Sequence, residues 1–202
     1  MAMKIIDGLK LEGWEVEIPD CGRDDLPQFF KDMGYKVGVE IGVWGGEFGK
    51  ILCSTGLKLY GVDPYAYEPT LTVYRKQENM DNAYAVAKET LKDCDYTIIK
   101  KHSMEALEDF PDESIDFVYI DGNHMYKFVM EDIVGWTKKV KKGGAICGHD
   151  YIFFYRPSYC EVKHVVRSYT KKNIKKWYVL GLRGKPIGFK RDTFRSWLWI
   201  KQ

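Results

Sequence analysis

The sequence has few of the residues that would cross-link it or anchor it in a bilayer. Its 202 residues include five cysteines, an odd number without a Cys-x-x-Cys pair, so neither a disulfide framework nor a structural zinc site is indicated. No run of about 18 apolar residues occurs, and the N-terminal residues lack the apolar core of a signal peptide. We therefore expect free thiols, no membrane partner and a cytoplasmic location.

Each half of the chain is short of one sign of charge. Residues 1–120 carry 13 Lys and Arg against 23 Asp and Glu, whereas residues 121–202 carry 18 against 6. A basic half can indicate a nucleic-acid surface, but these basic residues are spread over several expected elements and form no unbroken run. We interpret them as a solvated face and do not expect a nucleic-acid partner.

Apolar runs of strand length alternate with helix-length segments, as is typical of a parallel sheet covered on both faces. With 45% hydrophobic residues, the chain is long enough for one full core. We predict one α/β domain with a Rossmann-like, doubly wound, mostly parallel seven-stranded sheet and helices on both faces. Residues 1–35 are expected to be a helical lead-in, 36–150 the cofactor-binding core, and 151–202 a substrate-side segment with the last strands.

The expected elements form five βα-type units and a two-strand tail. Strands are expected at 37–41, 57–62, 96–100, 115–120, 145–147, 177–180 and 196–200. Helices are expected at 24–33, 47–53, 79–91, 103–107, 126–140 and 162–172. The aromatic tail 194–200 could lie in a homo-oligomer interface or complete the sheet, and we favour the sheet because side-chain types alternate along it.

Acidic, histidine and glycine residues gather at the carboxyl ends of the expected strands, and Ser103 and Met104 lie near one of these ends. In open α/β sheets, ligands bind outside the carboxyl ends of the strands, so these residues are the candidates for a site. In chain order the candidates are Glu40, Gly42, Asp63, Ser103, Met104, Asp121, His124, His149 and Asp150. Single acids there often only cap turns, but their recurrence at one edge favours a functional site.

The glycine loop after the first strand discriminates between cofactors. A dinucleotide site needs Gly-x-Gly-x-x-Gly, in which the central glycine lets a pyrophosphate approach the backbone. Here the glycines are Gly42, Gly45, Gly46 and Gly49, and Trp44 occupies the central position. S-adenosylmethionine carries no phosphate, and its amino group and sulfonium favour carboxylates and aromatic faces. Glu40, Trp44 and Asp63 therefore fit S-adenosylmethionine better than NAD or FAD.

Four segments together resemble a known family. They are Val39 to Gly46, Gly61 to Pro64, Tyr119 to Tyr126, and Lys142 to Tyr151. They are similar to class I S-adenosylmethionine-dependent methyltransferases of the small bacterial and phage type, methyltransferase family 24. The resemblance implies that Glu40 and the turn from Gly42 through Trp44 to Gly46 hold the methionine end. It further implies that Asp63 binds the ribose and Ser103 with Met104 the adenine, and we also count Asp121 as cofactor-binding.

The resemblance also implies a metal site. In related catechol-type and macrolide-sugar O-methyltransferases, the positional counterparts of Asp121, His149 and Asp150 bind magnesium. Magnesium prefers oxygen ligands, so either a softer ion such as manganese, iron or zinc is bound here, or His149 is not a ligand. Alternatively, His149 or His124 accepts a proton as a base, because histidine titrates near neutrality.

We therefore expect methyl transfer from S-adenosylmethionine to a hydroxyl of a small molecule or saccharide, assisted by a divalent metal such as Mg or Mn. Asp121, His149 and His124 are the expected catalytic residues. Three alternatives stay open: nucleic-acid methylation, binding of S-adenosylmethionine without turnover, and a nicotinamide oxidoreductase, which Trp44 disfavours. Residues 64–78 and 151–161 are expected to shape the acceptor pocket, but they contain no motif that identifies the acceptor.

Overall fold

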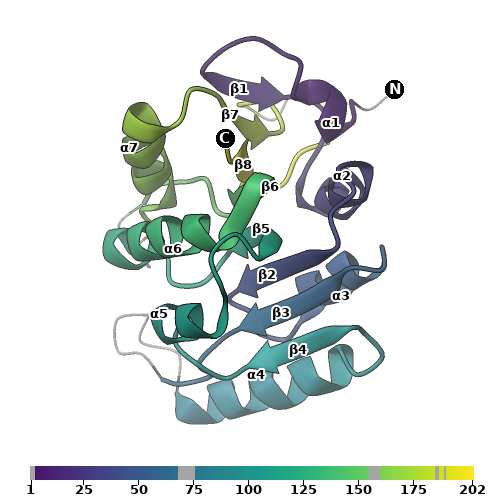
Figure 1. Cartoon of the computed structure of the whole chain (residues 1–202), viewed down its shortest axis with the longest axis vertical. Coiled ribbons are helices and arrows are strands. Elements are labelled where there is room, and N and C mark those ends of the chain that lie inside the picture. Colours follow the sequence, from purple (N-terminus) through teal and green to yellow (C-terminus); the bar gives the residue numbers. More distant parts are fainter. Residues whose placement is uncertain (1–2, 68–75, 155–159, 185–186, 189) are drawn as a thin grey trace.

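One eight-stranded sheet forms the centre of the molecule (Figure 1). The computed structural model describes residues 3–67, 76–154, 160–184, 187–188 and 190–202. The strand order is β1-β7-β8-β6-β5-β2-β3-β4, and only β8 runs antiparallel to its neighbours. The strands are β1 (Glu15–Ile18), β2 (Val37–Ile41), β3 (Lys58–Val62), β4 (Tyr96–Ile99), β5 (Ile115–Ile120), β6 (Val140–Gly148), β7 (Trp177–Leu180) and β8 (Trp197–Ile200). The predicted α/β fold is confirmed.

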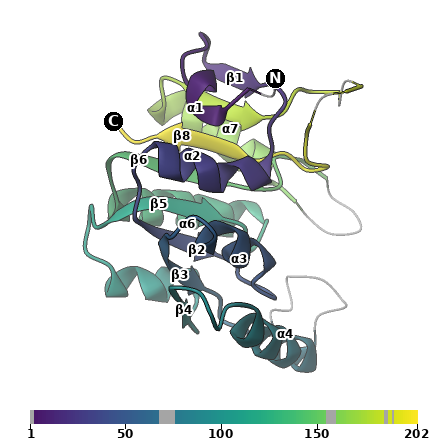
Figure 2. The ribbon, with the colours of Figure 1, turned by 90° about the vertical axis from the view of Figure 1, so that its right-hand side faces the viewer.

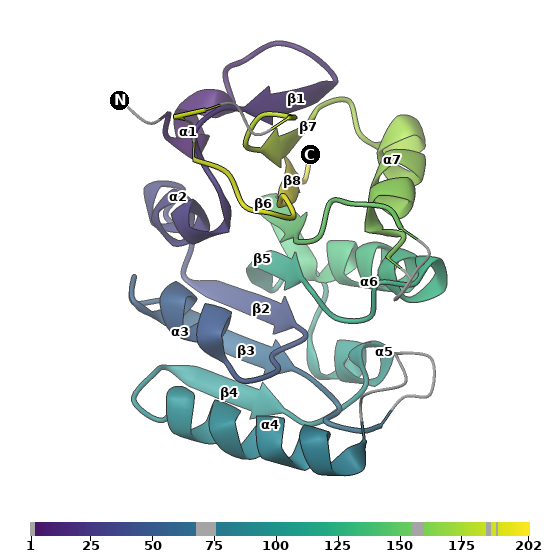
Figure 3. The ribbon, with the colours of Figure 1, turned by 180° about the vertical axis from the view of Figure 1, so that it is seen from behind.

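Helices cover both faces of the sheet, as predicted. α1 (Ile5–Gly8), α2 (Leu26–Asp32) and α3 (Glu47–Cys53) pack on one face. α5 (Ser103–Ala106), α6 (Tyr126–Lys139) and α7 (Val162–Asn173) pack on the other. α4 (Gln77–Thr90) adds a smaller cluster beside β4, and two 3-10 turns are η1 (Arg23–Asp25) and η3 (Leu107–Asp109). Figures 1 and 3 show the two faces, and Figure 2 shows the strands stacked along the long axis.

The prediction of seven strands is wrong by one, because the expected helical lead-in contains β1. This strand is only four residues long and pairs in parallel with β7 at the edge of the sheet. Its apolar residues Val16 and Ile18 are buried, whereas Glu15 and Glu17 alternate with them. Because Glu15 accepts a hydrogen bond from Tyr151 and Glu17 one from Arg183, the glutamates are stabilised by contacts that local sequence does not reveal.

The aromatic tail completes the sheet, as expected. β8 inserts between β6 and β7. The rings of Trp197 and Trp199 are buried and stacked, with their centroids 5.1 Å apart. Burial of two indole rings supplies a large apolar area to the core under α7. Homo-oligomer formation stays a prediction.

Two expectations from composition can be compared with the structure. All five cysteines are free thiols. Within the described ranges, no helix has both the length and the apolar character needed to span a bilayer. The cytoplasmic location stays a prediction.

Candidate active site

The carboxyl edge of the sheet holds the candidate residues through its own hydrogen bonds. Each of Gly42, Asp63, Asp121 and His149 directly follows the last residue of a strand, and each donates its backbone N–H to a carbonyl at the end of the neighbouring strand, at 2.8–3.2 Å. The parallel ladder therefore continues past the strands and fixes these residues relative to one another.

The loops after β2 and β5 lie in very close contact. Gly42 has a φ of +88°, and a Cβ placed on it would lie 2.3 Å from the carbonyl oxygen of Asp121. Only glycine can satisfy both the positive φ and the close approach. Because β2 lies between β3 and β5, this contact marks the point where the strand order reverses, which is where open α/β sheets bind ligands.

Asp63 shapes the glycine loop. Its Oδ2 accepts hydrogen bonds from the backbone N–H groups of Val43, at 3.0 Å, and Trp44, at 3.1 Å. Its Oδ1 accepts another from Tyr65 at 2.9 Å. Trp44 adopts a φ of +50°, and the residue is 44% exposed. Asp63 thus stabilises a strained turn that presents an indole ring at the surface, and its expected role toward ribose stays a prediction.

Glu40 lies in the interior behind that loop. The side chain is buried and accepts a hydrogen bond from Tyr96 Oη at 2.5 Å. A Cβ on Gly49 of α3 would come within 2.8 Å of Glu40 Oε2, so the small residue makes room for the carboxyl. Burial raises the pKa of Glu40 to about 8, the Tyr96 hydrogen bond opposes the rise, and the charge of Asp121 adds to it.

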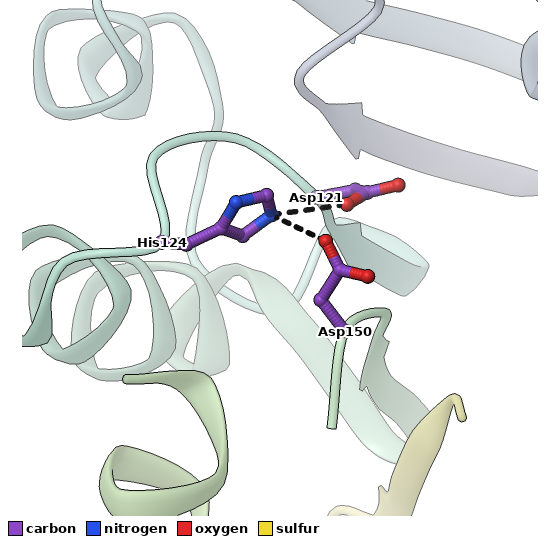
Figure 4. Close-up of side chains that lie close together, drawn as sticks. All are labelled: Asp121, His124 and Asp150. Atoms are coloured by element: carbon purple, nitrogen blue, oxygen red, sulfur yellow. Dashed lines mark hydrogen bonds and ion pairs between the residues drawn. The ribbon is translucent and has the colours of Figure 1, made fainter. Parts of the chain in front are cut away.

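Asp121, His124 and Asp150 form one cluster, drawn in Figure 4. His124 Nε2 lies 3.3 Å from Asp121 Oδ1 and 3.1 Å from Asp150 Oδ2. Donor atoms from the three residues all lie within 4.8 Å of one another, so they could hold one metal ion. His124, which was expected only as a base, is thus also a candidate metal ligand.

His149 lies at the side of this cluster. Its Nδ1 is 3.1 Å from Asp150 Oδ1 but 3.9 Å from Asp121 Oδ2. Burial tends to raise the pKa of Asp150, but the hydrogen bond with His149 and the charge of His124 outweigh it and lower the pKa. The predicted trio of Asp121, His149 and Asp150 lies close together, but the three residues whose donor atoms could share one ion are Asp121, His124 and Asp150, so His124 stands in the place predicted for His149.

Ser103 and Met104 make contacts with α6. Ser103 Oγ donates to Asp132 Oδ1 at 2.5 Å and accepts from Trp136 Nε1 at 2.8 Å. Burial raises the pKa of Asp132 to about 7, and Met104 packs against the same core. The Ser103 hydroxyl thus links α5 to α6 through hydrogen bonds. The expected contact of Ser103 and Met104 with adenine stays a prediction.

Arg23 is the site residue that sequence reasoning missed. Its Nη1 lies 3.8 Å from Asp121 Oδ2, and its guanidinium lies over the Phe48 ring at 5.0 Å. No local pattern distinguishes this arginine in the N-terminal segment. Of the segments expected to shape the acceptor pocket, residues 68–75 and 155–159 lie outside the described residues.

A family model described as a methyltransferase domain, methyltransferase family 24, matches residues 39–151, which is more than half of the chain. The chain belongs to this methyltransferase family. The predicted class I, S-adenosylmethionine-dependent methyltransferase is therefore confirmed, and the matched residues include the glycine loop and the Asp121, His124 and Asp150 cluster.

Solved structures share the fold of this methyltransferase at low sequence identity. An O-methyltransferase from Bacillus cereus in complex with SAH has a TM-score of 0.61 and 15% identity, over 89% of this chain and 80% of that one. TomG, an O-methyltransferase from Streptomyces achromogenes involved in tomaymycin synthesis and in complex with SAM, has a TM-score of 0.60 and 12% identity, over 89% and 79%. An rRNA methylase from Streptococcus thermophilus has a TM-score of 0.59 and 16% identity, over 88% and 95%.

A short sequence match also links the methyltransferase to a much longer protein. It is 34% identical over 53 residues to the uncharacterised protein y4gI of Sinorhizobium fredii. The match covers 26% of this chain and 6% of that protein.

Because Gly42 lies so close to Asp121, any side chain at position 42 should greatly lower the free energy of unfolding. We expect Gly42→Ala to lower the free energy of unfolding by at least about 3 kcal/mol, because backbone strain and steric overlap add. Gly56→Ala is the matched control, since Gly56 has a φ of +76° but nothing within 4 Å of a Cβ. It should cost only about 1–2 kcal/mol in urea denaturation. Equal losses in the free energy of unfolding for Gly42→Ala and Gly56→Ala would contradict the close contact between Gly42 and Asp121.

The buried Glu40 predicts a pH-dependent stability. Because the pKa of Glu40 is raised from 4.5 to about 8, the folded state holds an extra proton between these values, and stability falls as pH rises through this window. Glu40→Gln keeps an acceptor for Tyr96 and removes the titration. As the pH rises from 5 to 8, the free energy of unfolding of Glu40→Gln should increase relative to that of the wild type, by up to about 1.4 kcal/mol per pH unit. If the free energies of unfolding of the wild type and Glu40→Gln change in parallel between pH 5 and 8, the prediction is wrong. Glu108→Gln, at an exposed glutamate, is the control.

Proposed function

We propose that this methyltransferase transfers the methyl group of S-adenosylmethionine to a hydroxyl of a small molecule or saccharide. The observation that carries the proposal is the cluster of Asp121, His124 and Asp150, with His149 beside it, next to the glycine loop. The likeness to O-methyltransferases in complex with SAH and with SAM supports the cofactor and the reaction class.

The reaction needs a group that takes a proton from the acceptor. The acceptor oxygen attacks the methyl carbon in line, the carbon–sulfur bond breaks, and its electron pair leaves on sulfur to give S-adenosylhomocysteine. An alcohol is a weak nucleophile until its proton is lost, so the hydroxyl proton must pass to a base during the attack.

His149 is the base that this geometry favours. Its Nδ1 lies 3.1 Å from Asp150 Oδ1, a contact that favours the tautomer with the hydrogen on Nδ1. The lone pair is then on Nε2, which is the atom that accepts the hydroxyl proton. The carboxylate of Asp150 stabilises the resulting imidazolium.

The cluster also fits a divalent metal ion. Asp121 and Asp150 offer carboxylate oxygens and His124 offers Nε2, all within 4.8 Å. Two oxygens and one imidazole nitrogen suit manganese, iron or zinc better than magnesium. When bound, such an ion lowers the pKa of a coordinated alcohol and orients its oxygen.

Calorimetry and turnover test the proposal together. We expect the purified wild type to bind S-adenosylmethionine and S-adenosylhomocysteine, and to methylate members of a panel of phenols, alcohols and saccharides. His149→Asn keeps an N–H for Asp150 but cannot accept a proton, so turnover should fall about 10²- to 10⁴-fold at unchanged S-adenosylhomocysteine affinity.

Exposed His164, which stacks on Phe153 of a neighbouring loop, provides the matched control His164→Asn, which should leave turnover unchanged. Failure of the wild type to bind either cofactor form would refute the proposal. Methylation of RNA but of no small hydroxyl compound, with binding that weakens steeply in salt, would replace it by nucleic-acid methylation.

Metal binding can be measured apart from activity. After treatment with EDTA, the wild type should bind one Mn²⁺ per chain in calorimetry, and Asp150→Asn should weaken binding at least about tenfold. Asp109→Asn, a change of the same charge at an exposed site paired with Lys101, should leave Mn²⁺ affinity unchanged. If all three proteins bind Mn²⁺ equally or not at all, the cluster serves only in proton transfer.

A further inference from the structure

The backbone at Arg23 is held at the edge of the site by two carboxylates, that of the distant Asp192 and that of the nearby Asp25. Its backbone N–H donates to Asp192 Oδ2 at 2.6 Å, and the preceding Gly22 N–H donates to Asp25 Oδ2 at 2.8 Å. A Cβ on Gly22 would lie 2.5 Å from Asp192 Oδ1, so the turn packs tightly against the C-terminal segment. The origin of the arginine side chain is therefore fixed.

The guanidinium of Arg23 is positioned but retains hydrogen-bonding capacity. It lies over the ring of Phe48, which follows the glycine loop in the first turn of α3, and its side chain is 34% exposed. The 3.8 Å between Nη1 and Asp121 Oδ2 is an ion pair but too long for a hydrogen bond. Arginine has five N–H donors, so donors remain for a ligand that enters here.

The charge balance of this edge indicates what such a ligand carries. The carboxylates of Asp63, Asp121 and Asp150 repel any anion. In the described part of the chain, the ion pairs of these acids are formed with His124, His149 and Arg23, so Arg23 is the only arginine or lysine among their partners. The methionine end of S-adenosylmethionine has an ammonium and a carboxylate on one carbon. The acids suit the ammonium, whereas the carboxylate needs a cation close to them.

We propose that Arg23 binds the carboxylate of the methionine end of S-adenosylmethionine, with Phe48 as the platform that orients its guanidinium. The inference rests on the proposed function, because it assumes that the cofactor lies along the glycine loop. A planar guanidinium matches a carboxylate through two parallel N–H···O bonds, which a lysine cannot reproduce.

Two ligands that differ in one group test the inference. S-adenosyl-3-thiopropylamine is S-adenosylhomocysteine without its carboxylate, and both can be titrated into wild-type, Arg23→Met and Arg23→Lys protein by calorimetry. We expect Arg23→Met to weaken S-adenosylhomocysteine binding about 10- to 100-fold and Arg23→Lys to weaken it less. The affinity for S-adenosyl-3-thiopropylamine should be the same in all three proteins.

The controls separate this inference from the function on which it rests. Arg167→Met removes the same charge from α7, where Arg167 pairs with Glu15, and it should change neither affinity. Equal losses for both ligands in Arg23→Met would make Arg23 a structural residue and overturn the inference. Unchanged S-adenosylhomocysteine affinity in Arg23→Met would overturn the inference as well. Absence of any binding by the wild type would refute the proposed function itself.

Discussion

The active site depends on the hydrogen-bond ladder of the parallel sheet, which continues past the ends of its strands. The backbone N–H groups of Gly42, Asp63, Asp121 and His149 are bound to neighbouring strands, so the positions of these residues are set by strand register and not by their own loops. The same ladder crowds carboxylates at one edge. The guanidinium of Arg23 and the imidazoles of His124 and His149 lie against these carboxylates, and they are also the groups with chemistry to offer.

Most of the sheet could be predicted because its central strands are short apolar runs. The ranges 37–41, 115–120 and 177–180 agree with the structure to the residue, since strands buried on both faces leave a continuous apolar signal. β1 left no such signal. Its two glutamates are stabilised by Tyr151 and Arg183, which lie more than 130 positions further along the chain, and such contacts cannot be read from four residues.

The site was predictable to the extent that strand ends determine it. Asp121, His149 and Asp150 were expected together because they follow adjacent strands, and they lie together. The direction of single side chains was harder to predict. Glu40 alternates with Val39 and Ile41 along β2 and so points to the opposite face, toward α3, where Gly49 leaves room for it. Arg23 reaches Asp121 from a turn fixed by Asp192, and only the complete fold creates that contact.

The place of β8 has a consequence for the order in which the molecule assembles during synthesis. Among the strands of the described residues, β1 pairs with β7 alone, and β7 is joined to the rest of the sheet through β8, which comes after the other seven in sequence. Of these eight strands, β1 is therefore the first in sequence but the last to be joined to the rest of the sheet. Until then, the edge of β6 that pairs with β8 in the finished sheet has no strand beside it.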